Sequence, residues 1–229
     1  MLEVNNIDVA YGRAKALHRV SVSLQKGEMV FVVGRNGAGK TTLLKTIAGF
    51  LHPSQGVIDL EGESLLGLRP DQIARRGLRF VAQDKKVFGN LTVRDNLELA
   101  AHASGEGLED AVTRLVSLYP KFEQFLDKKA GGLSGGEREI LLIGRALVGE
   151  PGVLLVDEPT EGLAAIVIND IFRILSGMKE KISTIIVEQN LSVVGRLADR
   201  IYIMKEGKIE KEITDPAQIQ DAAQLEWHL

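Results

Sequence analysis

The spacing of apolar residues in the first sixty positions of the chain predicts β-strands. Apolar and polar side chains largely alternate from Leu2 to Val9 and from Ala16 to Leu24, which is typical of strands with one buried face. Residues 29–33 are all apolar, as expected of a strand that is buried on both faces of a sheet. A further strand is expected at residues 56–60, so this region is predicted to be rich in β-structure.

The rest of the chain changes from a helical pattern to alternating strands and helices. Apolar residues recur at helical spacing over 91–100 and 108–119, and residues 84–145 are expected to be mainly helical. Strands are then expected at 153–157, 184–187 and 200–204, and helices at 164–178 and 191–198.

Strands that alternate with helices of this length indicate a parallel α/β sheet. We therefore expect a single α/β domain over residues 1–229, with a phosphate-loop core and an N-terminal antiparallel β-layer. The core is expected to comprise about 1–83 and 146–229, with a helical subdomain at about 84–145.

The composition is that of an ordinary globular domain, with 45% hydrophobic and 26% charged residues. The chain has no cysteine, which excludes disulfides, thiolate metal sites and cysteine nucleophiles. Because the net charge is −3, a nucleic-acid partner is not expected. No segment approaches the roughly 18 consecutive apolar residues of a membrane span, and no secretory signal is visible. A cytoplasmic location is therefore expected.

A glycine-rich segment lies between the strand at 29–33 and a helix expected from Lys40 to Ala48. Its sequence, Gly34-Arg35-Asn36-Gly37-Ala38-Gly39-Lys40-Thr41, matches the phosphate-binding loop pattern in the required strand–helix context. The glycines let backbone N–H groups turn toward a phosphate, and the helix N-terminus adds positive potential. Lys40 can reach the β- and γ-phosphates of a nucleotide, while the Thr41 hydroxyl can bind Mg²⁺.

Two adjacent carboxylates end a second apolar strand, in the sequence Val153-Leu154-Leu155-Val156-Asp157-Glu158. Open α/β sheets bind ligands at the carboxyl ends of their strands, which is where these acids are expected. Apolar strands that end in two acids are common, and most of them have only a structural role. Beside a phosphate loop it indicates a nucleotide site, in which Asp157 holds Mg²⁺ and Glu158 acts as general base on water.

A third motif, Leu133-Ser134-Gly135-Gly136-Glu137-Arg138, precedes a helical run expected from Ile140 to Val148. Taken alone, a serine followed by two glycines is also a simple helix N-cap. Together with the other two motifs, in this order, the segment resembles the signature loop of ABC ATPases. The resemblance covers essentially the whole chain. It implies that the protein binds ATP and Mg²⁺ and hydrolyses ATP to ADP and phosphate.

The resemblance implies roles for further residues. Tyr11 stands where these proteins stack an aromatic ring on adenine, and Gln83 matches a glutamine that senses Mg²⁺. Ser134 and Gly136 match residues that bind the γ-phosphate held by a partner subunit, so a head-to-tail dimer is implied. The implied nucleotide ligands are Tyr11, Gly34, Asn36, Gly37, Ala38, Gly39, Lys40, Thr41, Thr42, Gln83, Ser134, Gly135, Gly136 and Glu137. The implied Mg²⁺ ligands are Thr41, Gln83 and Asp157, and the implied catalytic residues are Glu158, Lys40 and Gln189.

Three positions depart from the commonest pattern of these ATPases. Glu137 stands where a glutamine usually closes the signature, and Ala164 replaces an aspartate that makes a contact across the dimer. Gln189 replaces a histidine near the γ-phosphate; glutamine can donate a hydrogen bond there but cannot become cationic. A subunit that binds ATP but hardly hydrolyses it is therefore one alternative.

The segments Val187-Glu188-Gln189-Asn190 and Gly162-Leu163-Ala164 resemble the shorter ATPase subunit of branched-chain amino-acid importers. Glu161 and Gln83 are more similar to the urea and short-amide relatives of that group, so both solute classes stay open. A soluble ABC ATPase without a transport role is a further alternative.

The resemblance also implies partners. These are transmembrane permease subunits, a second ABC ATPase subunit (a paralogue or the same chain) and, indirectly, an external solute-binding protein. Residues 85–91, with Val87 and Phe88 exposed, are expected to form the groove for the permease. Simple packing of the helical subdomain would explain this pair equally well. The protein is then expected on the inner face of the cell membrane.

Overall fold

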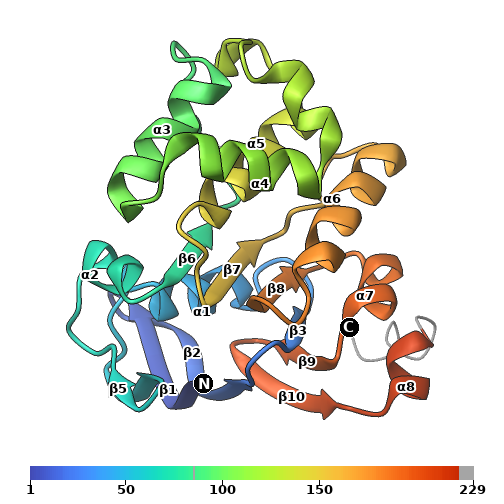
Figure 1. The fold of residues 1–229 in the computed structure, drawn as a ribbon. Helices are drawn as coiled ribbons and strands as arrows, with labels where there is room; N and C mark the ends of the chain where they lie inside the picture. Colours follow the sequence, from blue (N-terminus) through green and yellow to red (C-terminus); the bar gives the residue numbers. More distant parts are fainter. Residues whose placement is uncertain (85, 222–229) are drawn as a thin grey trace. The chain divides into compact units, whose positions relative to one another are not determined.

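The chain divides into two compact units in a computed structural model that describes residues 1–84 and 86–221 (Figure 1). The sheet unit comprises Met1–Phe80, Gly152–Glu158 and the described residues from Lys179 onward. The helical unit comprises Val81–Pro151 and Pro159–Met178.

The helical unit includes residues 159–178 in addition to the expected segment at about 84–145. Contacts with other parts of the unit hold this added stretch. The Tyr119 hydroxyl donates a hydrogen bond to Asp170 over 2.9 Å, and the Leu118 side chain packs closely against Gly177.

The sheet unit contains an antiparallel sheet with strand order β2-β1-β4-β5. The inward-facing side chains of its first residues, such as Leu2 and Val4 of β1, are buried, while Glu3 and Asn5 between and after them are exposed. This sheet is the N-terminal antiparallel layer that the alternation predicted. Its strands are β1 (Leu2–Tyr11), β2 (Ala14–Leu24), β4 (Gln55–Leu60) and β5 (Glu63–Ser64).

A second sheet has six strands in the order β10-β9-β3-β8-β7-β6. Strand β3 pairs in parallel with β8 and β9, and β7 pairs in parallel with β8, while β10 is antiparallel to β9. The predicted α/β fold with a parallel core is therefore confirmed. The strands are β3 (Met29–Val33), β6 (Leu78–Val81), β7 (Val153–Asp157), β8 (Ser183–Glu188), β9 (Arg200–Lys205) and β10 (Lys208–Ile213).

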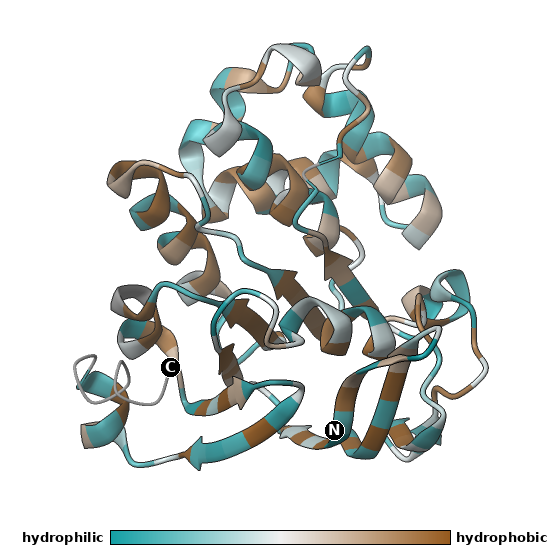
Figure 2. Ribbon diagram, turned by 180° about the vertical axis from the view of Figure 1, so that it is seen from behind, coloured by the Kyte–Doolittle hydropathy of each residue, from teal (hydrophilic) through white to brown (hydrophobic). Residues whose placement is uncertain are grey.

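The hydrophobic core of the sheet unit includes residues from both sheets. Strands β3, β7 and β8 are buried along their whole length, and they are mostly hydrophobic in Figure 2. Val32 and Val187 of the parallel strands share one buried cluster with Leu17 of the antiparallel sheet. The helices of this unit are α1 (Lys40–Ile47), α2 (Pro70–Arg75), α7 (Leu191–Leu197) and α8 (Pro216–Gln220).

The helical unit is built around four α-helices. Thr92 caps the first of them, as expected, because its hydroxyl accepts the N–H of Asp95 over 3.0 Å. Close packing is possible at Gly144, where an added Cβ would lie 2.9 Å from the Phe122 ring. The elements are α3 (Val93–Ser104), α4 (Leu108–Leu118), the 3₁₀ helices Pro120–Phe125 and Ala130–Gly132, α5 (Gly135–Leu147) and α6 (Ala165–Met178).

Some elements were not predicted. Strand β10 is mostly polar because it lies at the edge of its sheet, so it lacks the apolar pattern of a central strand. Helices α2 and α8 have only six and five residues, too few to show a helical period. Among the residues that the structure describes, no helix is both long and apolar enough to span a membrane.

Candidate nucleotide-binding site

The carboxyl ends of three parallel strands of the sheet unit lie at the same edge of the sheet. Val33, the last residue of β3, pairs with Glu188 of β8, and Asp157, the last residue of β7, pairs with Val187. The phosphate loop, the two acids of β7 and the segment after β8 therefore begin side by side. This is the edge at which open α/β sheets bind their ligands.

The glycines of the loop after β3 are required by the backbone and its surroundings. Gly37 and Gly39 have φ values of 81° and 107°, in the left-handed region that side chains disfavour. An added Cβ at Gly34 would lie 2.3 Å from the Met204 carbonyl oxygen, and one at Gly39 would lie 2.9 Å from Leu17. The loop is therefore held tightly against the ends of β2 and β9, and it leads directly into α1.

Lys40, the first residue of α1, points back into this loop. Its side chain is 4% exposed, and the ammonium group donates hydrogen bonds to the carbonyls of Gly34 (2.8 Å) and Arg35 (3.3 Å). Its Nζ atom also lies 3.0 Å from Oε1 of Glu158. The ammonium group is thus placed inside a loop of phosphate-binding sequence, with a carboxylate as its counter-ion.

Thr41 and Asp157 are brought together across 116 positions of sequence. The Thr41 hydroxyl donates a hydrogen bond to Oδ1 of Asp157 over 3.0 Å. Burial raises the pKa of Asp157 to about 6; the hydrogen bond from Thr41 opposes this shift, and the nearby charge of Glu158 adds to it.

These two residues fit a Mg²⁺ ion. Oδ2 of Asp157 is buried and has no hydrogen-bond partner in the part of the chain that the structure describes. A hydroxyl and a carboxylate oxygen are hard ligands that Mg²⁺ prefers, and this ion commonly takes only one or two protein ligands beside substrate phosphates.

Glu158 follows Asp157 immediately and leaves the strand in a left-handed conformation, with φ of 48°. Its N–H donates to the Val187 carbonyl over 3.0 Å, which holds the residue at the sheet edge. The side chain is 9% exposed. A non-glycine residue with positive φ is uncommon, and such conformations cluster at functional sites. The conformation turns the carboxylate toward Lys40, where it can act on a molecule bound at the loop.

Tyr11, at the end of β1, reaches the same helix. Its hydroxyl lies 3.4 Å from Oγ1 of Thr42, and the residue is 51% exposed. A large exposed aromatic ring beside the phosphate loop is available to stack on a base. Its role in binding adenine stays a prediction.

The segment after β8 is shaped by a buried acid. Glu188 is 2% exposed, and its Oε2 accepts the N–H groups of Gln189 (3.1 Å) and Asn190 (3.4 Å). Gln189 itself is exposed at the sheet edge. Its position after β8 agrees with the expected one, but its catalytic role is untested.

In the helical unit, the signature residues form the start of a helix. The prediction that they precede it was wrong, because α5 begins at Gly135 and Ser134 is its N-cap. The Ser134 hydroxyl accepts the N–H of Glu137, and Oε2 of Glu137 accepts the N–H of Ser134, which makes a capping box. Gly136 is needed because an added Cβ would lie 2.5 Å from Val167 of α6. The serine is therefore both a helix cap and an exposed hydroxyl.

Gln83 also lies in the helical unit, where its Nε2 donates a hydrogen bond to Oε2 of Glu161 over 2.8 Å. Its expected contact with Mg²⁺ stays a prediction. Of the expected permease groove, Lys85 lies outside the described residues. Phe88 is 50% exposed, but Val87 is half-buried, so only one of the pair has the expected exposure.

Phe88 is held in place by its neighbours. The buried Asn96 side chain bonds both the N–H and the carbonyl of Phe88, each over 3.1 Å, and the Arg145 guanidinium lies 5.2 Å from the ring centroid.

Sequence reasoning missed the residues that support the phosphate loop from outside. The N–H of Gly207 donates to the Ala38 carbonyl over 2.8 Å, and the N–H of His18 donates to the Gly207 carbonyl over 2.8 Å. Only the turn-forming glycine after Glu206 gives a sequence signal for this support.

Comparison with known proteins agrees with this geometry. Residues 17–161 match the family model described as ABC transporter. The chain is 39% identical to the high-affinity branched-chain amino acid transport ATP-binding protein BraG of Pseudomonas aeruginosa, over 95% of this chain and 94% of BraG.

Solved structures agree as well. An ATP-binding cassette of an ABC transporter has a TM-score of 0.87 and 30% identity, covering 100% of this chain and 98% of the other. A dimeric cassette bound to ADP and Pi, described as a post-hydrolysis state, has a TM-score of 0.83 and 27% identity, covering 93% and 98% of the two chains.

The chain therefore belongs to the ABC transporter family. Within that family it is an ATP-binding subunit with ATPase activity, and the predicted ABC ATPase fold is confirmed. Membership implies a membrane permease as its partner and a second ATP-binding subunit.

Proposed function

We propose that the protein is the ATP-hydrolysing motor subunit of an importer for branched-chain amino acids. It would act on the cytoplasmic face of the membrane, bound to a permease. An external solute-binding protein would deliver the amino acid to that permease. The observation that carries the solute class is the 39% identity to BraG, which extends over 95% of this chain.

Nucleotide binding begins with charge neutralisation at the phosphate loop. The Lys40 ammonium group would exchange its 3.0 Å contact with Glu158 for the β- and γ-phosphates, while loop N–H groups bind the phosphate oxygens. Thr41 and Asp157 would hold Mg²⁺, which supplies positive charge to the phosphate oxygens. The exposed Tyr11 ring would stack on adenine.

Hydrolysis then depends on Glu158. Once the phosphates of ATP have replaced Glu158 as the partner of Lys40, the Glu158 carboxylate can orient a water molecule toward the γ-phosphate. It can then accept a proton from that water. Gln189 would donate a hydrogen bond to the γ-phosphate, and Gln83 would sense the bound Mg²⁺. The chemistry is mostly positioning and electrostatic stabilisation, as in other phosphoryl transfers.

Ser134, Gly135, Gly136 and Glu137 would bind the ATP of a partner subunit rather than that of their own chain. The Ser134 hydroxyl is exposed and sits at the N-terminus of α5, where N–H groups and the helix dipole favour a phosphate. The similar cassette described as dimeric supports a dimer of ATP-binding subunits. ATP would then close the dimer, and hydrolysis would open it. In the complex the partner is expected to be a paralogous ATPase subunit.

The permease would bind at residues 86–91. The exposed Phe88 ring, fixed by Asn96 and Arg145, offers an apolar anchor for a helix of the permease.

Transport assays in proteoliposomes test the proposal. The chain is reconstituted with candidate permease, second-ATPase and binding-protein subunits from the same organism, and uptake of labelled leucine and labelled urea is measured with Mg-ATP inside. We expect ATP-dependent uptake of leucine only. Uptake of urea instead would assign the chain to the amide importers, and ATP hydrolysis without any permease association would contradict a transport role.

A further inference from the structure

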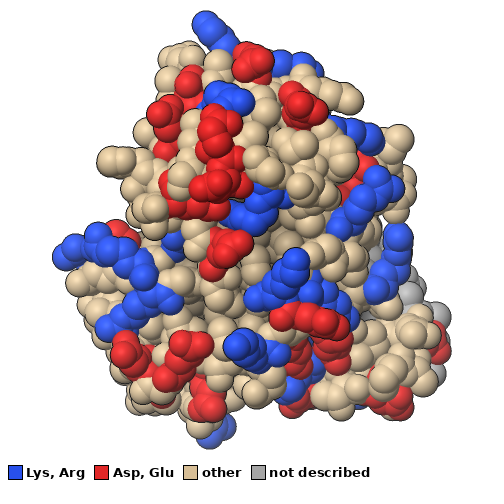
Figure 3. All heavy atoms as spheres, viewed as in Figure 1, with Lys and Arg blue, Asp and Glu red and all other residues tan. Residues whose placement is uncertain are grey.

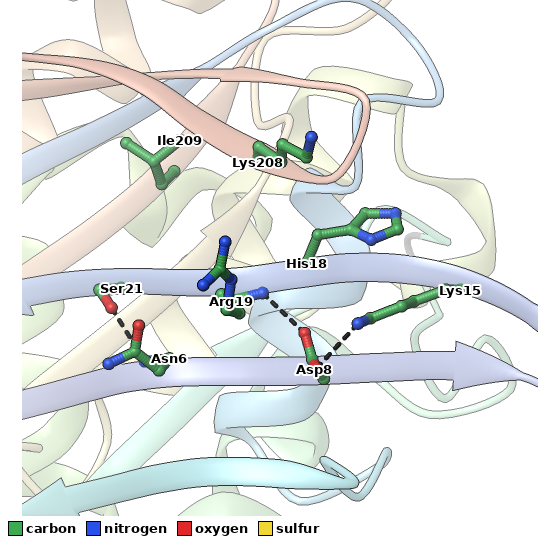
Figure 4. Close-up of a pocket in the computed structure, with 8 residues that line it drawn as sticks. All are labelled: Asn6, Asp8, Lys15, His18, Arg19, Ser21, Lys208 and Ile209. Carbon is green, nitrogen blue, oxygen red and sulfur yellow. Dashed lines mark hydrogen bonds and ion pairs between the residues drawn. The ribbon is translucent and has the colours of Figure 1, made fainter.

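An open pocket of about 680 Å³ lies on the sheet unit, and none of the residues that line it belongs to the phosphate loop (Figure 4). Strands β1, β2 and β10 line it, and four of its residues are basic or imidazole side chains: Lys15, His18, Arg19 and Lys208. Its volume is within the range of small-molecule sites. Nothing in the proposed ATPase mechanism uses it.

Two β-bulges shape this pocket. The pairing of β1 with β2 shifts register between Val4 and Ile7 and again between Ile7 and Val9. Asn6 and Arg19 lie at these shifts with φ values of 51° and 47°, in the left-handed region. A bulge redirects a side chain that a regular strand would aim elsewhere. In Figure 4 the Arg19 side chain extends from β2 toward β10, which carries Lys208.

Side chains hold both bulges in place. The N–H of Asn6 donates to the Ser21 hydroxyl over 2.9 Å, and the N–H of Arg19 donates to Oδ1 of Asp8 over 2.7 Å. Oδ2 of Asp8 pairs with Lys15 over 2.8 Å. The left-handed conformation of Arg19 is therefore built into the sheet by a buried acid and is not a loop irregularity.

The charge of Asp8 is already compensated. The hydrogen bond from Lys15 and that from the N–H of Arg19 lower the pKa of this carboxyl, so it stays ionised with its two partners. The charges of Lys15 and Asp8 therefore neutralise each other. The positive charges of Arg19 and Lys208 are not neutralised by this pair. Across the described residues, neither of these two has a carboxylate within ion-pair distance.

This local excess of positive charge contrasts with the net charge of the whole chain. The chain has a net charge of −3, and basic and acidic side chains are intermixed on the face shown in Figure 3. A guanidinium fork matches the oxygens of a phosphate or carboxylate, and a nearby ammonium group adds a second charge. The small concave site does not provide the extended basic surface that nucleic acid or a membrane requires.

We propose that this pocket is a second ligand site, which binds a small organic dianion through its phosphate or carboxylate group. Arg19 and Lys208 bind the charged group, Lys15 and His18 line the site, and Asp8 positions Arg19 by holding its backbone.

The full chain is titrated with inorganic phosphate, and the amide NMR signals of six pocket residues are measured: Asn6, Asp8, Arg19, Ser21, Lys208 and Ile209. The signals of His18 and Gly207 are left out because these residues are hydrogen-bonded to the phosphate loop or to its support. A parallel titration with succinate separates phosphate from carboxylate recognition, and sodium chloride at equal ionic strength is the reference. Site-resolved signals separate this pocket from binding at the phosphate loop. We expect saturable shifts with at least one dianion.

Arg19→Asn removes the charge with a residue that tolerates the left-handed backbone, and Lys208→Gln removes the second charge from an exposed position. Each is expected to weaken binding about tenfold. Lys26→Gln, an equal charge change at an exposed residue outside the pocket, should leave binding unchanged.

Shifts no larger than those with chloride would overturn the proposal. So would equal weakening by all three variants, since that would indicate non-specific attraction. Lys208→Gln keeps the test valid should Arg19→Asn disturb the bulge.

Discussion

At the scale of single residues, the Lys40 ammonium group has two competing partners: the Glu158 carboxylate and the phosphates of ATP. Both side chains are less than one-tenth exposed, so neither charge is well solvated. A buried ion pair holds little net stability, but the loss of one partner leaves the other charge uncompensated. Nucleotide binding therefore becomes an exchange of anions around one fixed cation.

Lys40→Ala is expected to weaken ATP binding by at least about tenfold, because hydrogen bonds to charged groups contribute about 1.5–3 kcal/mol. Binding of a fluorescent ATP analogue measures this. Lys26→Ala, at an exposed lysine of the same unit, should bind ATP normally. Unchanged affinity in Lys40→Ala would contradict the assignment of the phosphate loop.

Glu158→Gln is expected to lower ATP turnover about 10²–10⁴-fold, because an amide cannot accept the proton of water. ATP should bind at least as tightly as before, since Lys40 loses its charged competitor. Phosphate release and equilibrium binding measure the two effects. Glu3→Gln, at an exposed glutamate of β1, is the control and should leave both unchanged. Normal turnover in Glu158→Gln would remove this residue from the role of base.

At the scale of elements, two local structures matter: the N-terminus of α5 in the helical unit, and the turn between β9 and β10 in the sheet unit. Helix α5 starts with a capping box, in which Glu137 accepts the N–H of Ser134 and also pairs with Lys128 over 3.1 Å. The glutamate at this position therefore has a charged partner in Lys128 in addition to its role in the cap.

The Glu137 cap should depend on pH. The hydrogen bond from the N–H of Ser134 is the main cause that lowers the pKa of Glu137 below its ordinary 4.5. A lowered pKa in the folded state adds stability above about pH 4.5, which is lost as the pH falls through the folded-state pKa. Glu137→Gln should cost up to about 1 kcal/mol near neutral pH and less near pH 3.

Urea denaturation at the two pH values measures this difference, and Glu123→Gln, at an exposed acid of the same unit, is the control. A cost for Glu137→Gln that did not change with pH would show that the charge of the carboxylate plays no part in the cap.

Gly207→Ala tests the support of the phosphate loop. Gly207 has φ of 73°, and an added Cβ would lie 2.3 Å from the Ala16 carbonyl oxygen. The turn must move, which disturbs its hydrogen bond to Ala38. We expect a loss of about 1–3 kcal/mol in the free energy of unfolding and several-fold weaker ATP binding.

Gly62→Ala is the matched control, because Gly62 also has positive φ (82°) but nothing lies within 4 Å of an added Cβ. It should cost some stability without a change in ATP affinity. Equal ATP affinities for the two variants would show that the turn does not support the loop.

At the scale of the whole molecule, the proposed function requires a dimer with two shared sites. Ser134→Arg should leave ATP binding to the single chain nearly intact but block ATP-dependent dimerisation, since the bulky side chain fills the place of the partner's γ-phosphate. Lys40→Ala chains should also fail to dimerise. In a mixture, both lesions fall on one composite site and leave the other intact.

Light scattering with Mg-ATP should therefore detect more dimer in the mixture than in either variant alone. No gain on mixing, with both variants folded, would argue against shared sites.

The sequence by itself determined the chemistry of the phosphate loop and of the strand end at Asp157. Both are local, because the loop glycines, Lys40 and Thr41 lie in one strand–loop–helix segment whose backbone demands are visible as residue types. The parallel core could be predicted for the same reason, since apolar runs of strand length report burial on both faces. The short helices and the polar edge strand β10 could not, because they bury too few side chains to leave a pattern.

Only the tertiary structure decided which distant residues meet. The contact of Lys40 with Glu158, the hydrogen bond of Thr41 to Asp157 and the support of the loop by Gly207 all depend on strand register. The same is true of the bulge that turns Arg19 toward β10, because one extra residue in a strand redirects a side chain without any mark in the sequence. Residue types indicate the local conformation and chemistry of a segment, whereas strand register and burial decide which distant residues its side chains contact.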